Sequence, residues 1–401
     1  MNKNINFIIL NVNAYAAYET RDMAGSMRVK NIFDPLLNQP EVSLSNLVLL
    51  DLLSLQNNNN SQSSNAAVDC LSIGYTSFKS PASLLGYLKK GMQFIKTHYK
   101  KDAENIVYNY QHPDIRNFLF LLYAKMKGFK IVFDFVEDKQ HESVHTFNDK
   151  ARRNLSLFFL KLIPAYADAV FVISTHLLSE AGKLTRNKIP VYLLPISVDF
   201  KNIDIYQKEP VNGVAKIFYG GSFAQKDGLQ YLLPAIDILK EKKYQFKLIL
   251  TGKGRPEDVE KLFPKFKDND LIDYRGFLST EQYFKLLSSV DICCMTRNNS
   301  AFANAGFPFK LGEFLAAGKL IIASKIGDVD KFLTHKENAY LIKPESTEDI
   351  VEGLSYYLND LKNLSESMGS KARAVAEKNF DANISSRFML EKCRDLFIKN
   401  T

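Results

Sequence analysis

A lysine and a glutamate stand three residues apart within residues 300–324, which read SAFANAGFPFKLGEFLAAGKLIIAS. A glycine and a proline precede a predicted helix over 309–317, and a glycine follows where a C-terminal cap belongs. Lys310 and Glu313 therefore share one face of the first helical turn. The carboxylate could accept two hydrogen bonds from a vicinal diol such as ribose, and the ammonium group could reach a diphosphate. A solvated ion pair is the other interpretation of this spacing.

Three further loops follow predicted strands and carry glycines, which let a backbone approach a phosphate closely. The first loop, GGSFAQKDG over 220–228, adds a hydroxyl and a positive charge to its backbone amides. Each loop taken alone is equally typical of a plain strand–helix turn. The candidate residues in these loops are Gly221, Ser222, Lys226, Gly252, Gly276 and Phe277.

Short apolar runs alternate with helical patterns along the whole chain. This alternation predicts an α/β protein of two doubly wound, Rossmann-like domains with parallel sheets. Such sheets bind ligands at the carboxyl ends of their strands, which is where the four loops fall. Predicted strands lie at 6–12, 47–53, 105–110, 131–135, 169–173, 216–219, 246–251, 271–274, 292–295, 320–323 and 339–342, and predicted helices include 83–98, 113–127, 150–166 and 384–398.

The composition is that of a folded, two-domain protein. The 401 residues include 29 Phe and 19 Tyr, which excludes a mainly disordered chain. A polar stretch over 194–213 predicts the linker, so we expect domains over 1–200 and 214–380, and a terminal helix in 381–401 that packs back towards the first domain. The net charge of +8 is spread over both halves, which suits an anionic ligand or an anionic membrane surface better than nucleic acid.

The cysteines and the hydropathy favour the cytoplasm. The four cysteines show no metal-ligand spacing and predict free thiols in a reducing compartment. No apolar run reaches the length of a transmembrane helix, so any contact with the inner face of the membrane would be peripheral.

Taken together and in this order, the loops of residues 216–359 resemble the donor-binding half of a family 4 glycosyltransferase of GT-B fold. The first half resembles the family more loosely, through ADAVFVIS at 167–174 and LPISVD at 194–199. The resemblance implies an acceptor-binding and a donor-binding domain facing a cleft. It also implies transfer of a sugar from a nucleotide-sugar with retention of anomeric configuration, and no requirement for a metal or other cofactor.

Individual residues carry the resemblance. Lys226 corresponds to the lysine that neutralises the donor phosphates, and Glu313 to the second glutamate of the E-x7-E motif, which holds the ribose hydroxyls. Gly306 and Phe307 correspond to the loop whose backbone N–H groups face the diphosphate. The string F-P-x-K-L-x-E at 307–313 resembles a subgroup associated with bacterial surface polysaccharide synthesis.

Two positions depart from the family pattern. The first glutamate of the motif, which would touch the transferred sugar, falls on Ala305. The arginine that accompanies the lysine falls on Gly221, and Lys310 and Arg297 are the nearest replacements for its charge. A catalytically silent nucleotide-binding or partner subunit is therefore the alternative to an active enzyme.

The first half offers candidates for the donor phosphate and for the proton transfer. Gly25 and Arg28 open a helical stretch whose backbone N–H groups could face the phosphate. Glu137 follows a predicted strand and is the candidate catalytic carboxylate. Asp138, His141, His145 and His112 are further candidates, although residues of these types in a loop are more often simply solvated.

The expected chemistry needs little from the protein beyond positioning and positive charge, because the leaving diphosphate can accept the acceptor's proton. The D-N-D string at 268–270 is a weak match to a metal site. Basic residues flank apolar ones over 84–101 and 150–164, which suits either a solvated helix face or an anionic membrane near a lipid-linked acceptor.

Overall fold

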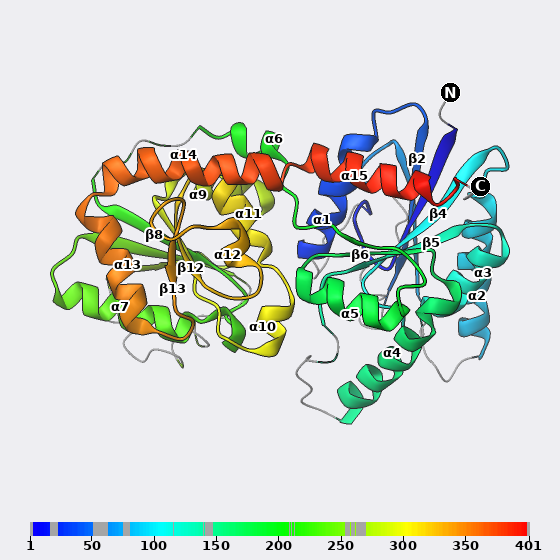
Figure 1. The fold of residues 1–401 in the computed structure, drawn as a ribbon, viewed down its shortest axis with the longest axis horizontal. Helices are drawn as coiled ribbons and strands as arrows, with labels where there is room; N and C mark the ends of the chain where they lie inside the picture. Colours follow the sequence, from blue (N-terminus) through cyan, green and yellow to red (C-terminus); the bar gives the residue numbers. More distant parts are fainter. Residues whose placement is uncertain are drawn as a thin grey trace. The chain divides into compact units, whose positions relative to one another are not determined.

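The computed structural model describes residues 3–16, 23–50, 63–74, 81–114, 116–138, 140, 147–207, 209, 211, 213–252, 257, 261 and 270–398. The chain divides into two units, Met1–Ser197 with Ala382–Thr401 and Val198–Asp381 (Figure 1). The passage from the first unit to the second lies within the stretch predicted as the linker.

The first unit is built on a seven-stranded parallel sheet in the order β3-β2-β1-β4-β5-β6-β7. The strands are β1 (Asn4–Leu10), β2 (Val42–Leu49), β3 (Val68–Ile73), β4 (Ala103–Tyr110), β5 (Lys130–Phe135), β6 (Ala169–Val172) and β7 (Val191–Leu193). The helices are α1 (Met23–Phe33), α2 (Pro81–Thr97), α3 (Phe118–Met126), α4 (Phe147–Tyr166), α5 (Thr175–Thr185) and α15 (Ala382–Asp395), and the 3-10 turn η1 (Asp34–Leu36) follows α1.

The helices of this unit form two layers. The crossover through α1 steps towards the β3 edge, whereas those through α3, α4 and α5 step towards the β7 edge. Right-handed crossovers in opposite directions cover opposite faces of a sheet. Consistently, α1 packs against α15, while α2, α3, α4 and α5 pack side by side in that order.

The second unit has a six-stranded parallel sheet in the order β10-β9-β8-β11-β12-β13. Its strands are β8 (Ala215–Gly220), β9 (Phe246–Thr251), β10 (Ile272–Tyr274), β11 (Ile292–Met295), β12 (Leu320–Ser324) and β13 (Tyr340–Ile342). Its helices are α6 (Phe200–Asp204), α7 (Leu229–Glu241), α9 (Thr280–Ser289), α10 (Ala301–Ala305), α11 (Phe309–Ala316), α12 (Val329–Phe332), α13 (Thr347–Asn359) and α14 (Leu361–Asn379), with the 3-10 turn η3 (Gln225–Asp227).

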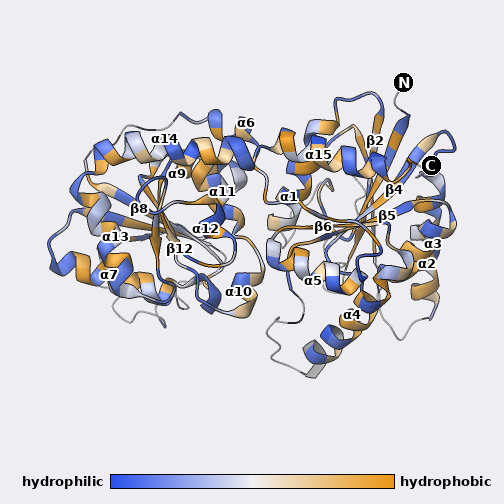
Figure 2. Ribbon diagram, in the orientation of Figure 1, coloured by the Kyte–Doolittle hydropathy of each residue, from blue (hydrophilic) through white to orange (hydrophobic). Residues whose placement is uncertain are grey.

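Apolar strands explain why both sheets lie in the middle of their units. In Figure 2 the strands of both sheets are mostly orange, and the outer faces of the covering helices carry most of the blue. Residues of β8, β9, β11 and β12 pack with α7 and α13 in the core of the second unit. A parallel sheet covered on both faces needs such near-continuous apolar strands.

The predicted fold class is confirmed, but two strands of the first sheet were missed. β3 and β7 lie at its edges, and neither has a long apolar run: β3 reads VDCLSI and β7 only VYL. β2 was predicted over 47–53 but spans Val42–Leu49, because its first half alternates polar and apolar residues. The strand predicted at 6–12 is β1, Asn4–Leu10. All four cysteines are buried and free, as expected.

Candidate functional site

The loops after β8, β9 and β10 are tied together by backbone hydrogen bonds. The N–H of Gly221 donates to the Thr251 carbonyl at 3.0 Å, and that of Gly252 donates to the Gly276 carbonyl at 2.9 Å. A Cβ atom on Gly252 would lie 1.9 Å from the Gly221 carbonyl oxygen, so any side chain there would separate the two loops. The predicted glycines Gly221, Gly252 and Gly276 therefore lie together at the carboxyl edge of the second sheet.

Lys310 and Glu313 lie on α11, beside this edge. The hydroxyl of Tyr283 on α9 donates a 2.5 Å hydrogen bond to Glu313 Oε2. Lys310 Nζ lies 4.9 Å from the centre of the Tyr283 ring, a cation–π distance. The described contacts of the two charged groups include no ion pair between them, which disfavours the solvated-pair interpretation.

The Lys310 ammonium group points at the end of β8. Its Nζ lies 3.2 Å from the position that a Cβ atom on Gly220 would occupy, and Thr251 Oγ1 lies 3.3 Å from the same position. The absence of a side chain at Gly220 therefore leaves room for the lysine at the base of the glycine loop. A phosphate bound by that loop would meet this ammonium group.

Burial shifts the titration of this pair. Both side chains are partly buried. Desolvation raises the pKa of Glu313, against the opposing effects of Lys310 and the Tyr283 hydrogen bond. Desolvation lowers the pKa of Lys310, against the attraction of Glu313 and Asp227. Such shifts in the pKa values of two neighbouring, desolvated charged groups are typical of ligand-binding sites.

Further charged side chains lie in the loop after β8 and beside it. The backbone N–H and the hydroxyl of Ser222 both donate to Asp227 Oδ2, at 3.1 and 2.6 Å. Arg297 Nε lies 3.8 Å from Asp227 Oδ1. Lys226 Nζ lies 4.8 Å from the centre of the Phe302 ring of α10. The Ser222 hydroxyl therefore binds within its own loop, while Lys226 and Arg297 add positive charge near that loop.

The first turn of α11 offers backbone donors. No side chain caps this helix, whose N-cap residue is Pro308, and no acidic residue stands in its first turn. Uncapped N–H groups at a helix N-terminus attract anions. Phe307 is buried and packs on Phe332 and Phe380 with ring centroids 5.5 and 5.7 Å apart. Anything that Gly306 and Phe307 offer a ligand must therefore come from their backbone.

Phe277 is 46% exposed beyond the Gly276 turn, whose φ of +64° is in the left-handed region. A Cβ atom on Gly276 would meet nothing within 4 Å, so the backbone there is open to a ligand on that side.

The predicted role of Arg28, like that of Gly25, concerned backbone N–H groups at the start of α1 and remains a prediction, but the structure shows that the Arg28 side chain is occupied elsewhere. Its side chain is fully buried, and its Nε and Nη2 atoms bind the two carboxylate oxygens of Asp134 at 2.7 and 2.8 Å. The remaining contacts go to the carbonyls of Leu194 and Pro195, both at 2.9 Å. The guanidinium group is thus occupied within the first unit. Gly25 is buried in the first turn of α1, and its predicted role remains a prediction.

The candidate carboxylates lie where β5 ends. Glu137 is half-buried, and its carbonyl oxygen accepts a 2.7 Å hydrogen bond from His112 Nε2. Asp138 is buried and lies 3.2 Å from Nε2 of His176, a residue that the sequence analysis did not single out. His176 follows β6, the neighbour of β5, so the shared carboxyl edge of the two strands was the available signal. His141 and His145 lie outside the described residues.

Tyr283 was also missed. It stands four residues into α9, which begins with a capping box of Ser279 and Gln282. Its spacing from Glu313, thirty residues along the chain, carries no local signal.

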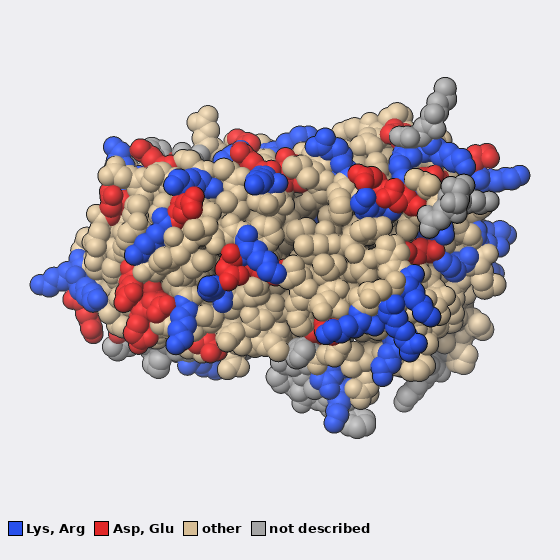
Figure 3. Space-filling view, in the orientation of Figure 1, with Lys and Arg blue, Asp and Glu red and all other residues tan. Residues whose placement is uncertain are grey.

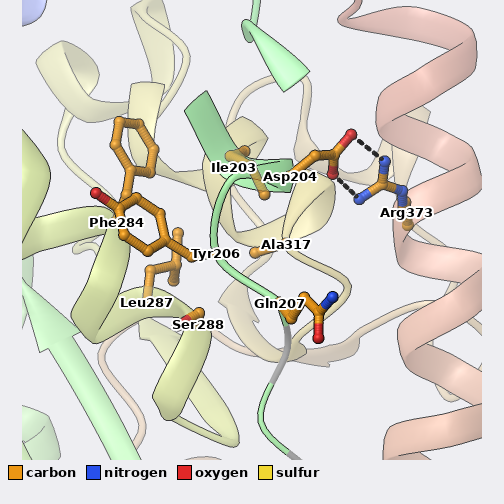
Figure 4. A pocket seen from close by; sticks show the side chains of 9 residues that line it. All are labelled: Ile203, Asp204, Tyr206, Gln207, Phe284, Leu287, Ser288, Ala317 and Arg373. Carbon is orange, nitrogen blue, oxygen red and sulfur yellow. Dashed lines mark hydrogen bonds and ion pairs between the residues drawn. The ribbon is translucent and has the colours of Figure 1, made fainter. Parts of the chain in front are cut away.

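A cavity of about 260 Å³ in the second unit lies away from these loops (Figure 4). Its walls include the last turn of α9 and Ala317, just after α11, whereas Tyr283 and Lys310 stand near the other ends of those helices. Arg373 of α14 binds both carboxylate oxygens of Asp204 at its rim, at 2.8 and 3.1 Å. The cavity therefore does not belong to the candidate site.

Within the described part of the chain, no cluster of three or more His, Cys, Asp or Glu side chains could hold a metal ion. Asp268 and Asn269 of the D-N-D string lie outside it. Among the helices that the structure describes, none is long and apolar enough to cross a membrane.

Residues 201–375 match the family model of the glycosyl transferases group 1. An uncharacterized glycosyltransferase of Bacillus subtilis is 25% identical over 220 residues, which are 54% of this chain and 56% of that relative. An uncharacterized glycosyltransferase of Methanocaldococcus jannaschii is 24% identical over 322 residues, 71% of this chain and 80% of that one. The matched segment thus spans little more than half of the first relative and most of the second.

Solved structures share the fold over nearly the whole chain. Sucrose-phosphate synthase from Thermosynechococcus elongatus superposes with a TM-score of 0.74 at 16% identity, covering 98% of this chain and 99% of that one. Anabaena HepE, solved in complex with UDP and glucose, gives 0.69 at 12% identity and covers 98% and 99%. The fold is GT-B, and the family model and relatives support a glycosyltransferase.

Proposed function

We propose that the protein is a glycosyltransferase that moves a sugar from a nucleotide-sugar to a glycan or lipid-linked acceptor, with retention of configuration, in bacterial surface polysaccharide synthesis. The observation that supports it most is the grouping of Glu313, Tyr283 and Lys310 beside the glycine loops. An ionised carboxylate held by a hydroxyl, next to a positive charge and an uncapped helix, fits a ribose attached to a diphosphate.

In this proposal the donor spans the loops of the second unit. Glu313 accepts hydrogen bonds from the two ribose hydroxyls while Tyr283 holds one of its oxygens. Lys226, Lys310 and Arg297 surround the diphosphate, and the backbone of Gly306, Phe307 and the α11 first turn adds donors. Structures of Anabaena HepE with UDP and with UDP-glucose lend the proposal a precedent of the same fold.

The transfer step then depends more on positive charge beside the diphosphate than on an acid–base pair of the protein. The bond between the anomeric carbon and the diphosphate oxygen breaks, and the acceptor hydroxyl bonds to the same carbon on the same face. The acceptor's proton passes to the departing diphosphate, whose charge the lysines stabilise. No metal enters this step as proposed. Glu137 remains the candidate catalytic carboxylate of the first unit.

The alternative of a silent subunit rests on Ala305. This residue is fully buried at the end of α10, so no carboxylate reaches the transferred sugar from that position. A protein of this kind would bind nucleotide without turning it over.

Incubation of the purified chain with UDP-, GDP- and CMP-sugars separates the two functions. We expect slow release of free sugar from one donor, with its anomeric configuration retained in the first product. Binding of a nucleotide without release would favour the silent subunit. No affinity for any nucleotide, in a folded protein, would contradict both.

Donor binding is expected to weaken in acid. The carboxylate must be ionised to accept from two hydroxyls, and burial raises the pKa of Glu313 from its usual 4.5. Affinity for a UDP-sugar should therefore fall as the pH falls through this raised pKa, at a higher pH than an exposed glutamate would give. Calorimetry across the acid range measures this, and Glu313→Gln should remove the dependence. If the affinity of the Glu313→Gln variant still fell in acid as it does in the unchanged protein, the pH dependence would belong to another titrating group.

A further inference from the structure

The positive charge of the chain is concentrated in the helix layer of α2, α3, α4 and α5. Segments 81–101, 118–127, 147–166 and 175–188, which we call the basic layer, hold fourteen Lys and Arg against two Asp and Glu. The rest of the chain holds 38 against 42 and is net negative. Of the thirteen whose side chains the structure describes, eleven are exposed. The net charge is therefore spread over both halves of the sequence, but in the folded first unit the basic residues gather in one helix layer.

Part of this concentration is visible in Figure 3, where Lys and Arg gather over α4 and α5. Not every charge is free, since Lys125 binds Asp168 at 2.6 Å and Lys183 binds Glu180 at 2.7 Å. Lys89, Lys90 and Lys161 are exposed, and no acidic residue stands within segment 81–101 to neutralise the first two.

Large apolar side chains are exposed on the same layer. Leu85 of α2 is 67% exposed, Phe158 of α4 is 56% exposed, and Leu84, Leu119 and Leu155 are exposed beside them. Among the side chains of α4 that the structure describes, the first buried one is that of Leu160. Exposed leucines and an exposed phenylalanine among lysines are typical of a surface that enters the headgroup region of a bilayer.

Three of these apolar side chains, those of Leu84, Leu85 and Leu119, lie towards one edge of the layer, whereas Leu155 and Phe158 belong to the middle of α4. Leu84 and Leu85 belong to the first turns of α2, and Leu119 is the second residue of α3. These helices follow parallel strands, so their first turns lie at the carboxyl edge of the sheet, where ligands bind. Part of the apolar surface of the layer thus lies at the edge where parallel sheets bind their ligands.

We propose that the basic layer docks the first unit on an anionic phospholipid surface, with the exposed leucines and Phe158 inserted and the lysines on the headgroups. This rests on the proposed function only in that a lipid-linked acceptor would be delivered there. Nucleic acid and acidic protein would also meet the lysines, but both would leave the apolar side chains in water. The combination of charge and apolar exposure favours the lipid.

Sedimentation of the full chain with vesicles tests the proposal. We expect binding to vesicles of equal parts phosphatidylcholine and phosphatidylglycerol, weakened by added salt, and little binding to phosphatidylcholine alone. Lys89→Glu with Lys90→Glu should lower the bound fraction about tenfold, and Leu85→Ser with Phe158→Ser should do so without removing a charge. The matched control is Lys240→Glu with Lys242→Glu, exposed lysines at the end of α7 in the second unit.

Each of the possible results decides for or against the proposal. Equal binding to both kinds of vesicle, or an equal loss in the control variant, would overturn the proposal. So would tight binding to single- or double-stranded DNA with no binding to vesicles. Affinity for UDP, measured without vesicles, should be the same in all variants, so a protein that docks on lipid but binds no nucleotide would contradict the proposed function alone. Circular dichroism confirms that each variant is folded.

Discussion

Replacement of Glu313 by alanine is expected to weaken the binding of the preferred nucleotide about 100-fold, a loss of about 3 kcal/mol. Two hydrogen bonds from ribose hydroxyls to an ionised carboxylate account for this size. The change also leaves the Tyr283 hydroxyl without its 2.5 Å acceptor. Isothermal calorimetry with UDP and GDP measures the effect.

Two companion variants make this result specific. Tyr283→Phe keeps the ring under Lys310 but removes the hydrogen bond that orients the carboxylate, so we expect about a tenfold loss. The double variant should lose less than the two single losses together, because the residues act as one unit. Full affinity in a folded Glu313→Ala protein would show that the carboxylate does not hold the ribose.

The candidate site of the second unit was largely predictable because its signals are local. Lys310 and Glu313 share a helix face through a spacing of three residues, and the predicted glycines follow short strands whose positions the sequence predicted. The strand bounds predicted at 246–251 and 292–295 are those observed. In a doubly wound sheet these local features suffice, because all carboxyl ends meet at one edge.

The residues whose roles the sequence did not reveal depend on distant partners. Arg28 has a sequence context typical of a helix start, but its partner Asp134 stands 106 residues away and turns it into a buried structural group. Tyr283 and His176 acquire their roles only from Glu313 and Asp138. Asn46 of β2 is buried and donates to the carbonyl oxygens of Ile9 and Val12, partners that its own stretch of sequence does not reveal.

Arg28→Met is expected to destabilise the first unit by about 3–5 kcal/mol. The change leaves the Asp134 carboxylate, which is fully buried, without the two donors that neutralise it. It also removes the donors to the Leu194 and Pro195 carbonyls, which hold the chain just before it leaves the unit. Urea unfolding followed by circular dichroism measures the loss as a lower midpoint of the first transition.

Arg373→Met is the matched control, because Arg373 also binds a carboxylate through two nitrogens but in solvent. Its partner Asp204 has a half-exposed side chain, so we expect a loss of about 1 kcal/mol or less. The double variant Arg28→Met with Asp134→Leu should recover most of the stability, since it removes the buried charge together with its partner. A loss in Arg28→Met no larger than in Arg373→Met would mean that water reaches Asp134, and Arg28 would again be a candidate for binding a ligand.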